Sequence, residues 1–235
     1  MIEQFLPAAS TYAQDIDRLF TLIFVLVGFW LIVSEVVFFV LIIRYRKKDG
    51  TSADYYTGEE KELKRWITIP HALVLVCDIF IVVGAVSVWY DVKQDLPPAE
   101  QTVRVIGQQW AWSFVHPGPD KRLDTADDIK TVDELHIVVD TPYIYELEAR
   151  DVLHSFSVPA FRLKQDAVPG RVITGWFQPT MTGTFDLQCA EICGIGHGLM
   201  AARVFVESPG EHAAWMAQRS PVELAAVTAP TPSEE

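Results

Sequence analysis

Two cysteines, a histidine and a methionine lie within one twelve-residue segment, Cys189-Ala-Glu-Ile-Cys193-Gly-Ile-Gly-His197-Gly-Leu-Met200. Thiolate, imidazole and thioether are soft donors, and together they favour copper over hard cations. A mononuclear electron-transfer copper site needs only one cysteine, so the second thiolate requires an explanation. Two thiolates can bridge two metal ions, and such a pair would rearrange little when it takes up a single electron. The segment therefore predicts a dinuclear copper site.

Two alternatives remain open for these cysteines. In an exported domain Cys189 and Cys193 could form a disulfide, and two cysteines with two histidines could hold a tetrahedral zinc ion. A disulfide explains neither the methionine nor the histidines, and a closed zinc site has no use for a thioether. The third cysteine, Cys77, lies in an apolar run, where a small buried packing residue is expected.

The segment resembles the CuA loop of cytochrome c oxidase subunit II, C-x-E-x-C-x-x-x-H-x-x-M, at every position of that pattern. An upstream segment resembles the family's histidine-bearing strand and runs Asp151-Val-Leu-His154-Ser-Phe-Ser-Val-Pro, followed by Lys164-Gln-Asp-Ala-Val-Pro-Gly-Arg171. A third segment, Gly107-Gln-Gln-Trp110-Ala-Trp112-Ser113, resembles the family's aromatic stretch. The three motifs and a preceding helix pair follow the family's order.

The resemblance implies a role for each matching residue. It implies a dinuclear copper centre held by His154, Cys189, the backbone carbonyl of Glu191, Cys193, His197 and Met200. It also implies that the Glu191 carboxylate reaches a Mg²⁺ ion at the interface with subunit I, and that electrons enter through Trp110. Trp112 and Trp176 are expected to pack in the core.

The resemblance further implies an activity for the whole chain. The chain would be the electron-input subunit of a respiratory haem-copper oxidase, taking electrons from a separate cytochrome c and passing them to haem in subunit I, where O₂ becomes water. The same copper module could instead serve a nitric oxide reductase. A free copper carrier is disfavoured by the membrane anchor, and quinol oxidases have similar subunits without the copper ligands. No nucleic acid partner is expected.

Two apolar runs, Leu19 to Ile43 and Trp66 to Trp89, are each long enough to cross a bilayer as a helix of about 20 residues. The segment joining them is basic and carries Arg44, Arg46, Lys47, Lys48, Lys61, Lys64 and Arg65. The positive-inside rule places this segment in the cytoplasm and the copper domain outside. We therefore expect a multi-pass protein of the bacterial inner membrane facing the periplasm. The first fifteen residues do not predict a cleaved signal peptide.

The expected fold is a two-helix transmembrane hairpin followed by an all-β cupredoxin-like sandwich. We expect an outer-side tail over 1–15, the hairpin over 16–92, a Pro-containing linker over 93–100 and the copper domain over 101–210. Alternating apolar residues at Tyr143 to Ala149 and Met200 to Val206 predict strands. Ser208 and Glu211 form a capping-box pattern, which predicts a short helix before a disordered tail within 211–235.

Charge offers further expectations. From residue 91 onward the chain has 21 acidic and 11 basic residues, a balance that would steer a basic cytochrome c. The segment 118–128 is acidic; it predicts a solvated insertion, although a Ca²⁺ site or a part of the docking face stays open. Glu35 and Asp78 interrupt the apolar runs and suit either proton movement or interhelical hydrogen bonding. His116, His136 and His212 lie outside the motifs and are expected to be surface or core residues.

Overall fold

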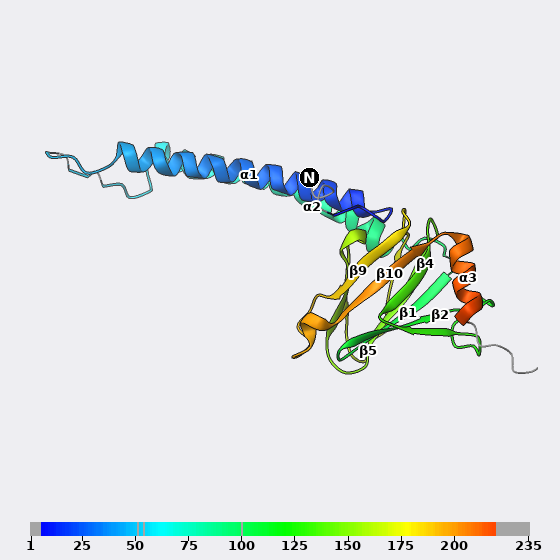
Figure 1. The fold of residues 1–235 in the computed structure, drawn as a ribbon. Coiled ribbons are helices and arrows are strands. Elements are labelled where there is room, and N and C mark those ends of the chain that lie inside the picture. Colours follow the sequence, from blue (N-terminus) through cyan, green and yellow to red (C-terminus); the bar gives the residue numbers. More distant parts are fainter. Residues whose placement is uncertain (1–5, 51, 54, 100, 220–235) are drawn as a thin grey trace, which may run out of the picture. The chain divides into compact units, whose positions relative to one another are not determined.

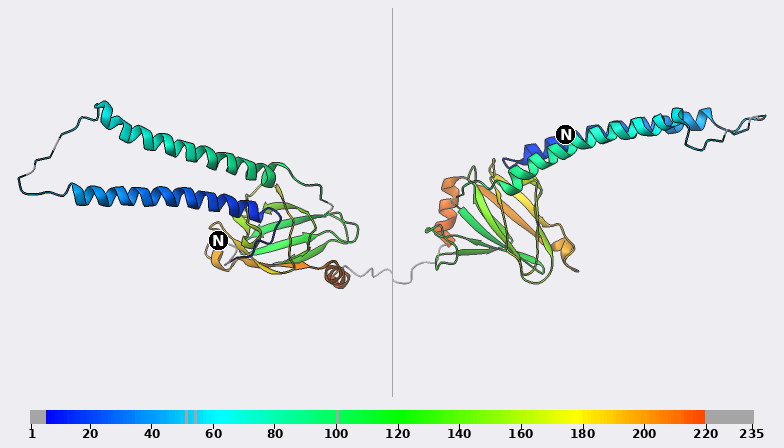
Figure 2. Two further views of the ribbon diagram at one scale, coloured as in Figure 1. Left: turned by 90° about the horizontal axis from the view of Figure 1, so that it is seen from above. Right: turned by 180° about the vertical axis from the view of Figure 1, so that it is seen from behind.

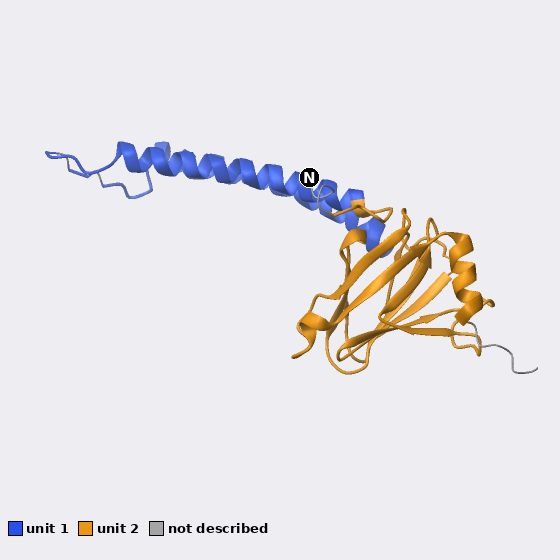
Figure 3. Ribbon diagram, in the orientation of Figure 1, with its two compact units in different colours: residues 1, 14–94 blue, residues 2–13, 95–235 orange. Residues whose placement is uncertain are grey.

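The computed structural model describes residues 6–50, 52–53, 55–99 and 101–219 (Figure 1). The chain divides into two compact units, coloured separately in Figure 3. The first contains residues 14–94 and is helical, whereas the second contains residues 2–13 and 95–235 and holds the β-strands.

The helical unit consists of α1 (Ala13–Arg44), α2 (Lys61–Trp89) and a π-helical turn, η2 (Tyr90–Gln94). Among the described residues, α1 and the continuous helix made by α2 and η2 are the two that are long and apolar enough to cross a membrane. They form a hairpin in which Trp30 Nε1 donates a hydrogen bond to Cys77 Sγ at 3.4 Å. Cys77 is therefore half-buried between the helices rather than fully buried. The side chains of Glu35 and Asp78 are exposed on this hairpin, so a partner or water must meet them in a membrane.

The described strands of the second unit form two five-stranded sheets, visible from two sides in Figure 2. One sheet has the order β3-β2-β1-β5-β8, with strands Ile129–Val132, Ala111–His116, Gln101–Gln108, Tyr143–Ala149 and Ile173–Phe177. The other has the order β4-β10-β9-β6-β7, with strands Glu134–Val138, Ala201–Glu207, Gly183–Cys189, His154–Val158 and Leu163–Ala167. The pairs β1 with β5 and β4 with β10 are parallel, and the other pairs are antiparallel.

The core lies between the sheets because alternate residues of each strand point inward. In β5 every second residue from Tyr143 to Ala149 is buried, and Trp112 on β2 is fully buried, as expected. The fold is thus the expected cupredoxin-like sandwich. Trp176 was wrongly expected in the core: it is half-buried, because it alternates with the inward residues of β8, and it packs against Tyr12. Strand β5 has the predicted bounds, while β10 begins at Ala201 because Met200 turns inward at the end of the preceding loop.

Hydrogen bonds fix residues 6–13 on the sandwich and start the helix that follows β10. Residues 6–13, expected to form a tail, belong to the sandwich: Ala9 N donates to Ala160 O at 2.8 Å, and Ser10 Oγ donates to Phe161 O at 2.8 Å. After β10, helix α3 (Pro209–Arg219) begins with the predicted capping box, in which Ser208 N and Oγ both contact the Glu211 carboxylate. The predicted tail from residue 220 onward lies outside the described residues.

Candidate metal centre

Three chain segments bring the predicted ligands together at one end of the sandwich. His154 is the first residue of β6, Cys189 is the last residue of β9, and the other ligands lie in the loop between β9 and β10. His154 is completely buried beside the edge of Trp112, with ring centroids 6.0 Å apart. Gly107 makes room for this imidazole, because a Cβ atom there would lie 3.0 Å from His154 Cδ2.

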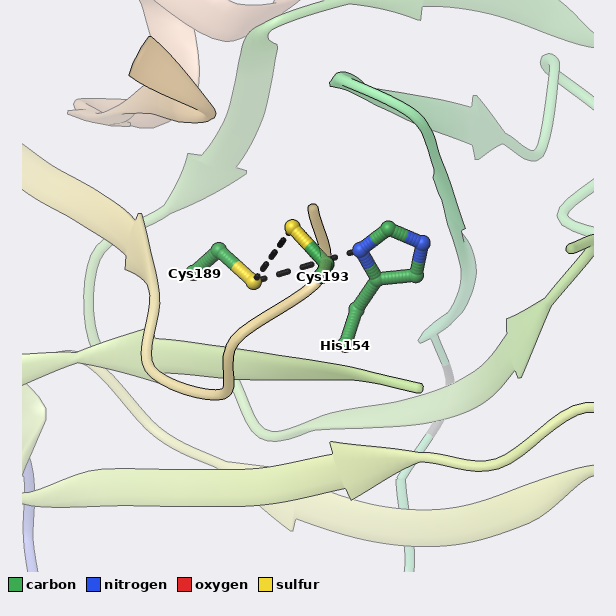
Figure 4. Close-up of side chains that lie close together, drawn as sticks. All are labelled: His154, Cys189 and Cys193. Atoms are coloured by element: carbon green, nitrogen blue, oxygen red, sulfur yellow. Dashed lines mark hydrogen bonds between the residues drawn. The ribbon is translucent and has the colours of Figure 1, made fainter. Parts of the chain in front are cut away.

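The sulfur atoms lie at the centre of the cluster (Figure 4). Cys189 Sγ is 3.9 Å from His154 Nδ1 and 3.7 Å from Cys193 Sγ. Cys193 Sγ is in turn 3.7 Å from both His197 Nδ1 and Met200 Sδ. Both thiols are free, so the alternative of a disulfide between them is wrong for this structure.

These donors fit copper. Ligand atoms of His154, Cys189 and Cys193 all lie within 4.8 Å of one another, and a buried methionine sulfur adjoins them. A set of two thiols, two imidazoles and a thioether is softer than a structural zinc site requires. Burial, together with the neighbouring Cys189, raises the pKa of the Cys193 thiol to about 11. Metal binding to this cluster would therefore release protons.

Glu191 presents its two oxygen-bearing groups to different surroundings. Its backbone carbonyl oxygen lies 3.2 Å from Cys189 Sγ, close to the sulfur cluster. Its carboxylate instead accepts a hydrogen bond from Lys164 Nζ at 2.9 Å, in a pair whose side chains are both substantially exposed. The carbonyl can thus coordinate a metal held by the cluster, while the carboxylate is available for interactions at the protein surface.

Trp110 lies in the turn between β1 and β2 and covers the loop that carries the thiols. Its Nε1 atom donates to the backbone carbonyl of Cys193 at 3.3 Å, while 39% of the residue remains exposed. The ring rests directly on Gly196, where a Cβ atom would lie 2.5 Å from Trp110 Cδ2. Trp110 therefore has both an exposed surface and a hydrogen bond to a predicted ligand residue, Cys193.

Asp151 is a site residue that the sequence reasoning left without a role, although the motif around His154 contained it. Its carboxylate accepts hydrogen bonds from His154 Nε2 at 2.8 Å, Val152 N at 2.7 Å and Gln109 N at 2.8 Å. Burial alone would raise its pKa, but these hydrogen bonds outweigh burial and lower the pKa below the ordinary aspartate value. Its position three residues before a predicted ligand histidine was the sequence signal that could have identified Asp151.

The three histidines of the sandwich that lie outside the motifs gather away from the metal cluster, around Trp215 of α3. The Trp215 ring lies 5.1 Å from His116, 4.2 Å from His136 and 5.2 Å from His212, measured between ring centroids. The Glu207 carboxylate accepts from both His136 Nδ1 and His212 Nδ1, at 2.8 and 2.9 Å. These histidines are packed and hydrogen-bonded, as expected.

The acidic insertion 118–128 connects β2 to β3. Arg104 on β1 forms a two-pronged pair with the Asp124 carboxylate at 2.7 and 3.0 Å. The hydroxyl of Thr125 donates to Asp127 Oδ1 at 2.7 Å. Part of the insertion's negative charge is therefore balanced within the domain.

Comparisons with known proteins agree with this architecture. The family model described as cytochrome c oxidase subunit II, periplasmic domain, matches residues 101–208. The alternative cytochrome c oxidase subunit 2 of Bradyrhizobium diazoefficiens is 34% identical over 239 aligned positions, which cover 91% of this chain and 83% of that protein. The cytochrome c oxidase subunit 2 of Cereibacter sphaeroides is 30% identical, with 97% of this chain and 84% of that protein covered.

A solved structure is also similar to part of the chain. The periplasmic domain of subunit II of cytochrome oxidase of Bradyrhizobium japonicum is 28% identical, covers 53% of this chain and 96% of that domain, and has a TM-score of 0.48. The relatives in sequence extend over both helices and the sandwich. The chain therefore belongs to the cytochrome c oxidase subunit 2 family, whose members are parts of an oxidoreductase complex.

Proposed function

We propose that this chain is the electron-input subunit of a cytochrome c oxidase and holds a dinuclear CuA centre. The observation that carries the proposal is the convergence of two free thiols, His154, His197 and Met200 at one end of the sandwich. When bound, the copper pair would supply a one-electron store between a cytochrome c and the haem of subunit I, where O₂ is reduced to water.

The residues around the cluster support such a role by holding their positions and excluding water. His154, Cys189, Cys193 and Met200 are buried, the most exposed of them being Cys189 at 7%. A closely packed interior resists displacement of its side chains, so the ligands would rearrange little between two oxidation states. Trp110 provides the exposed surface at which a donor can approach, and its hydrogen bond leads to the backbone of Cys193.

The family and the charge distribution support a proposal for the partners and the location. We propose that the hairpin crosses the bacterial inner membrane, with the basic segment between α1 and α2 in the cytoplasm. The sandwich would then face the periplasm, where a basic cytochrome c could dock on an acidic domain. Subunit I and membrane lipid would cover the exposed apolar helices. A shared Mg²⁺ ion would bind the Glu191 carboxylate, of which one oxygen now accepts from Lys164 Nζ.

The proposal is tested by the copper content of the purified full-length chain. Wild-type protein reconstituted with copper should bind two ions and show an electron-spin signal shared over two copper nuclei. Cys193→Ser removes one of the two thiolates that would hold the copper pair and should abolish that signal. Cys77→Ser is the matched control, because Cys77 lies between the membrane helices, outside the sandwich. A wild-type chain that binds a single copper ion would contradict the dinuclear assignment.

A further inference from the structure

The Asp151 carboxylate lies between two parts of the candidate site that are distant in sequence. Its Oδ1 atom accepts from His154 Nε2 and from Val152 N, and its Oδ2 atom accepts from Gln109 N. His154 begins β6 in one sheet, whereas Gln109 follows β1 in the other sheet. One side chain therefore connects the first residue of β6 in one sheet to the turn that follows β1 of the other sheet.

The bond to His154 determines which nitrogen of the imidazole carries the proton. An ionised carboxylate only accepts hydrogen bonds, so His154 Nε2 must be the protonated nitrogen. In the neutral imidazole, which is the form that binds metals, the lone pair is then on Nδ1, the atom 3.9 Å from Cys189 Sγ. Carboxylates bound in this way commonly orient metal-binding histidines and make them more basic.

The bond to Gln109 holds the turn that carries Trp110. From that turn, Gln109 Nε2 and Trp110 Nε1 both donate to the carbonyl oxygen of Cys193, at 2.8 and 3.3 Å. The hydrogen bonds thus connect His154, Asp151, the turn and Cys193. The position of Trp110 and the orientation of His154 depend on the same carboxylate.

We propose that Asp151 is a positioning residue that fixes the tautomer and orientation of His154 and, through the Gln109 turn, the position of Trp110 over the Cys193 carbonyl. This inference rests on the proposed copper-binding function. An amide cannot replace the carboxylate, because it offers one acceptor oxygen where Asp151 offers two. Asp151→Asn must therefore lose its bond to His154 or its bond to Gln109.

The first test concerns the histidine and needs no copper. In full-length protein with ¹⁵N-labelled histidine, His154 should show a proton on Nε2 that exchanges slowly with solvent. Asp151→Asn should speed that exchange or change the tautomer. Asp186→Asn is the charge-matched control, because Asp186 lies on β9 and pairs with Arg203 at the surface. A wild-type His154 protonated on Nδ1 would overturn the proposal, as would an Asp151→Asn variant in which neither the His154 proton nor the Gln109 backbone amide exchanges faster.

The second test concerns Trp110 and uses the copper-loaded chain. Asp151→Asn should weaken copper binding by about 10–100-fold and slow reduction by cytochrome c, while Asp186→Asn should leave copper binding unchanged. In a Trp110→Phe background the additional effect of Asp151→Asn on the reduction rate should shrink, because both changes act on the same route. Equal effects of Asp151→Asn in the two backgrounds would refute the link to Trp110. Failure of the wild-type chain to bind two copper ions would instead refute the proposed function, since the histidine measurement is independent of copper.

Discussion

Replacing Gly196 by alanine should displace the tryptophan through which we propose electrons enter. An added Cβ atom would lie 2.5 Å from Trp110 Cδ2 and 2.6 Å from Cγ. Carbon atoms pack at about 3.5–4.0 Å, so the ring or the loop must move by roughly 1 Å. Gly196 has φ of −90°, a backbone conformation that alanine also adopts. The expected effect is therefore steric, and overpacking should lower the free energy of unfolding by about 1–3 kcal/mol.

This displacement should weaken the 3.3 Å hydrogen bond from Trp110 Nε1 to the Cys193 carbonyl. Misplacement of a reacting group by about 1 Å can lower a rate by up to about 100-fold. Reduction of the copper centre by cytochrome c, followed by stopped-flow absorbance, should slow accordingly in Gly196→Ala. Gly198→Ala is the matched control, because a Cβ atom there meets nothing within 4 Å. The reasoning is wrong if both variants accept electrons at the wild-type rate with normal copper spectra.

Three further predictions concern stability, docking and the membrane helices. Burial, reinforced by His136 and His212, lowers the pKa of His116 from 6.5 to about 3. Below pH 6.5 the unfolded chain then binds more protons than the folded chain. This histidine should therefore lower the free energy of unfolding by about 2 kcal/mol at pH 5. Denaturant titrations of His116→Gln should therefore show a smaller loss of stability between pH 7 and pH 5 than wild type; an equal loss would contradict the assignment. Reduction by a basic cytochrome c should slow as salt rises, because exposed charges are screened over about 8 Å at physiological salt. Trp110→Ala should instead lower the rate of electron transfer within the docked complex without changing the salt dependence. Asp78→Asn should slow turnover or proton pumping but not copper reduction if this carboxylate moves protons, whereas normal turnover with poor assembly would indicate a structural role.

The ligand set could be predicted from sequence because its spacing is local. Cys189, Cys193, His197 and Met200 lie within one loop, so the pattern alone brings their donors close together. The sandwich was also predictable, because alternation of apolar residues in segments such as β5 reports a face buried against a second sheet. His154, which joins the loop from another strand, depended on the resemblance to a known family.

The hydrogen bonds that orient the ligands could not be predicted in the same way. The bond from Gln109 to Asp151 joins two loops that are far apart in the sequence, and no periodicity in either segment reports it. The packing of His116 and His136 against Trp215 likewise depends on how α3 lies on the strands. The position of residues 6–13 against the sandwich was missed because their contacts are with distant residues such as Ala160.

The acidic insertion 118–128 and Trp110 lie near opposite ends of β2, which bears on where a basic donor would dock. The insertion 118–128 follows the end of β2 at His116, whereas Trp110 precedes the start of that strand at Ala111. Six extended residues separate the two ends by about 20 Å, which is more than twice the Debye length of about 8 Å at physiological salt. Asp124 in the insertion is moreover paired with Arg104. Attraction of a basic donor toward Trp110 must therefore come mainly from acidic residues elsewhere on the domain, and the insertion is a poor candidate for the docking face.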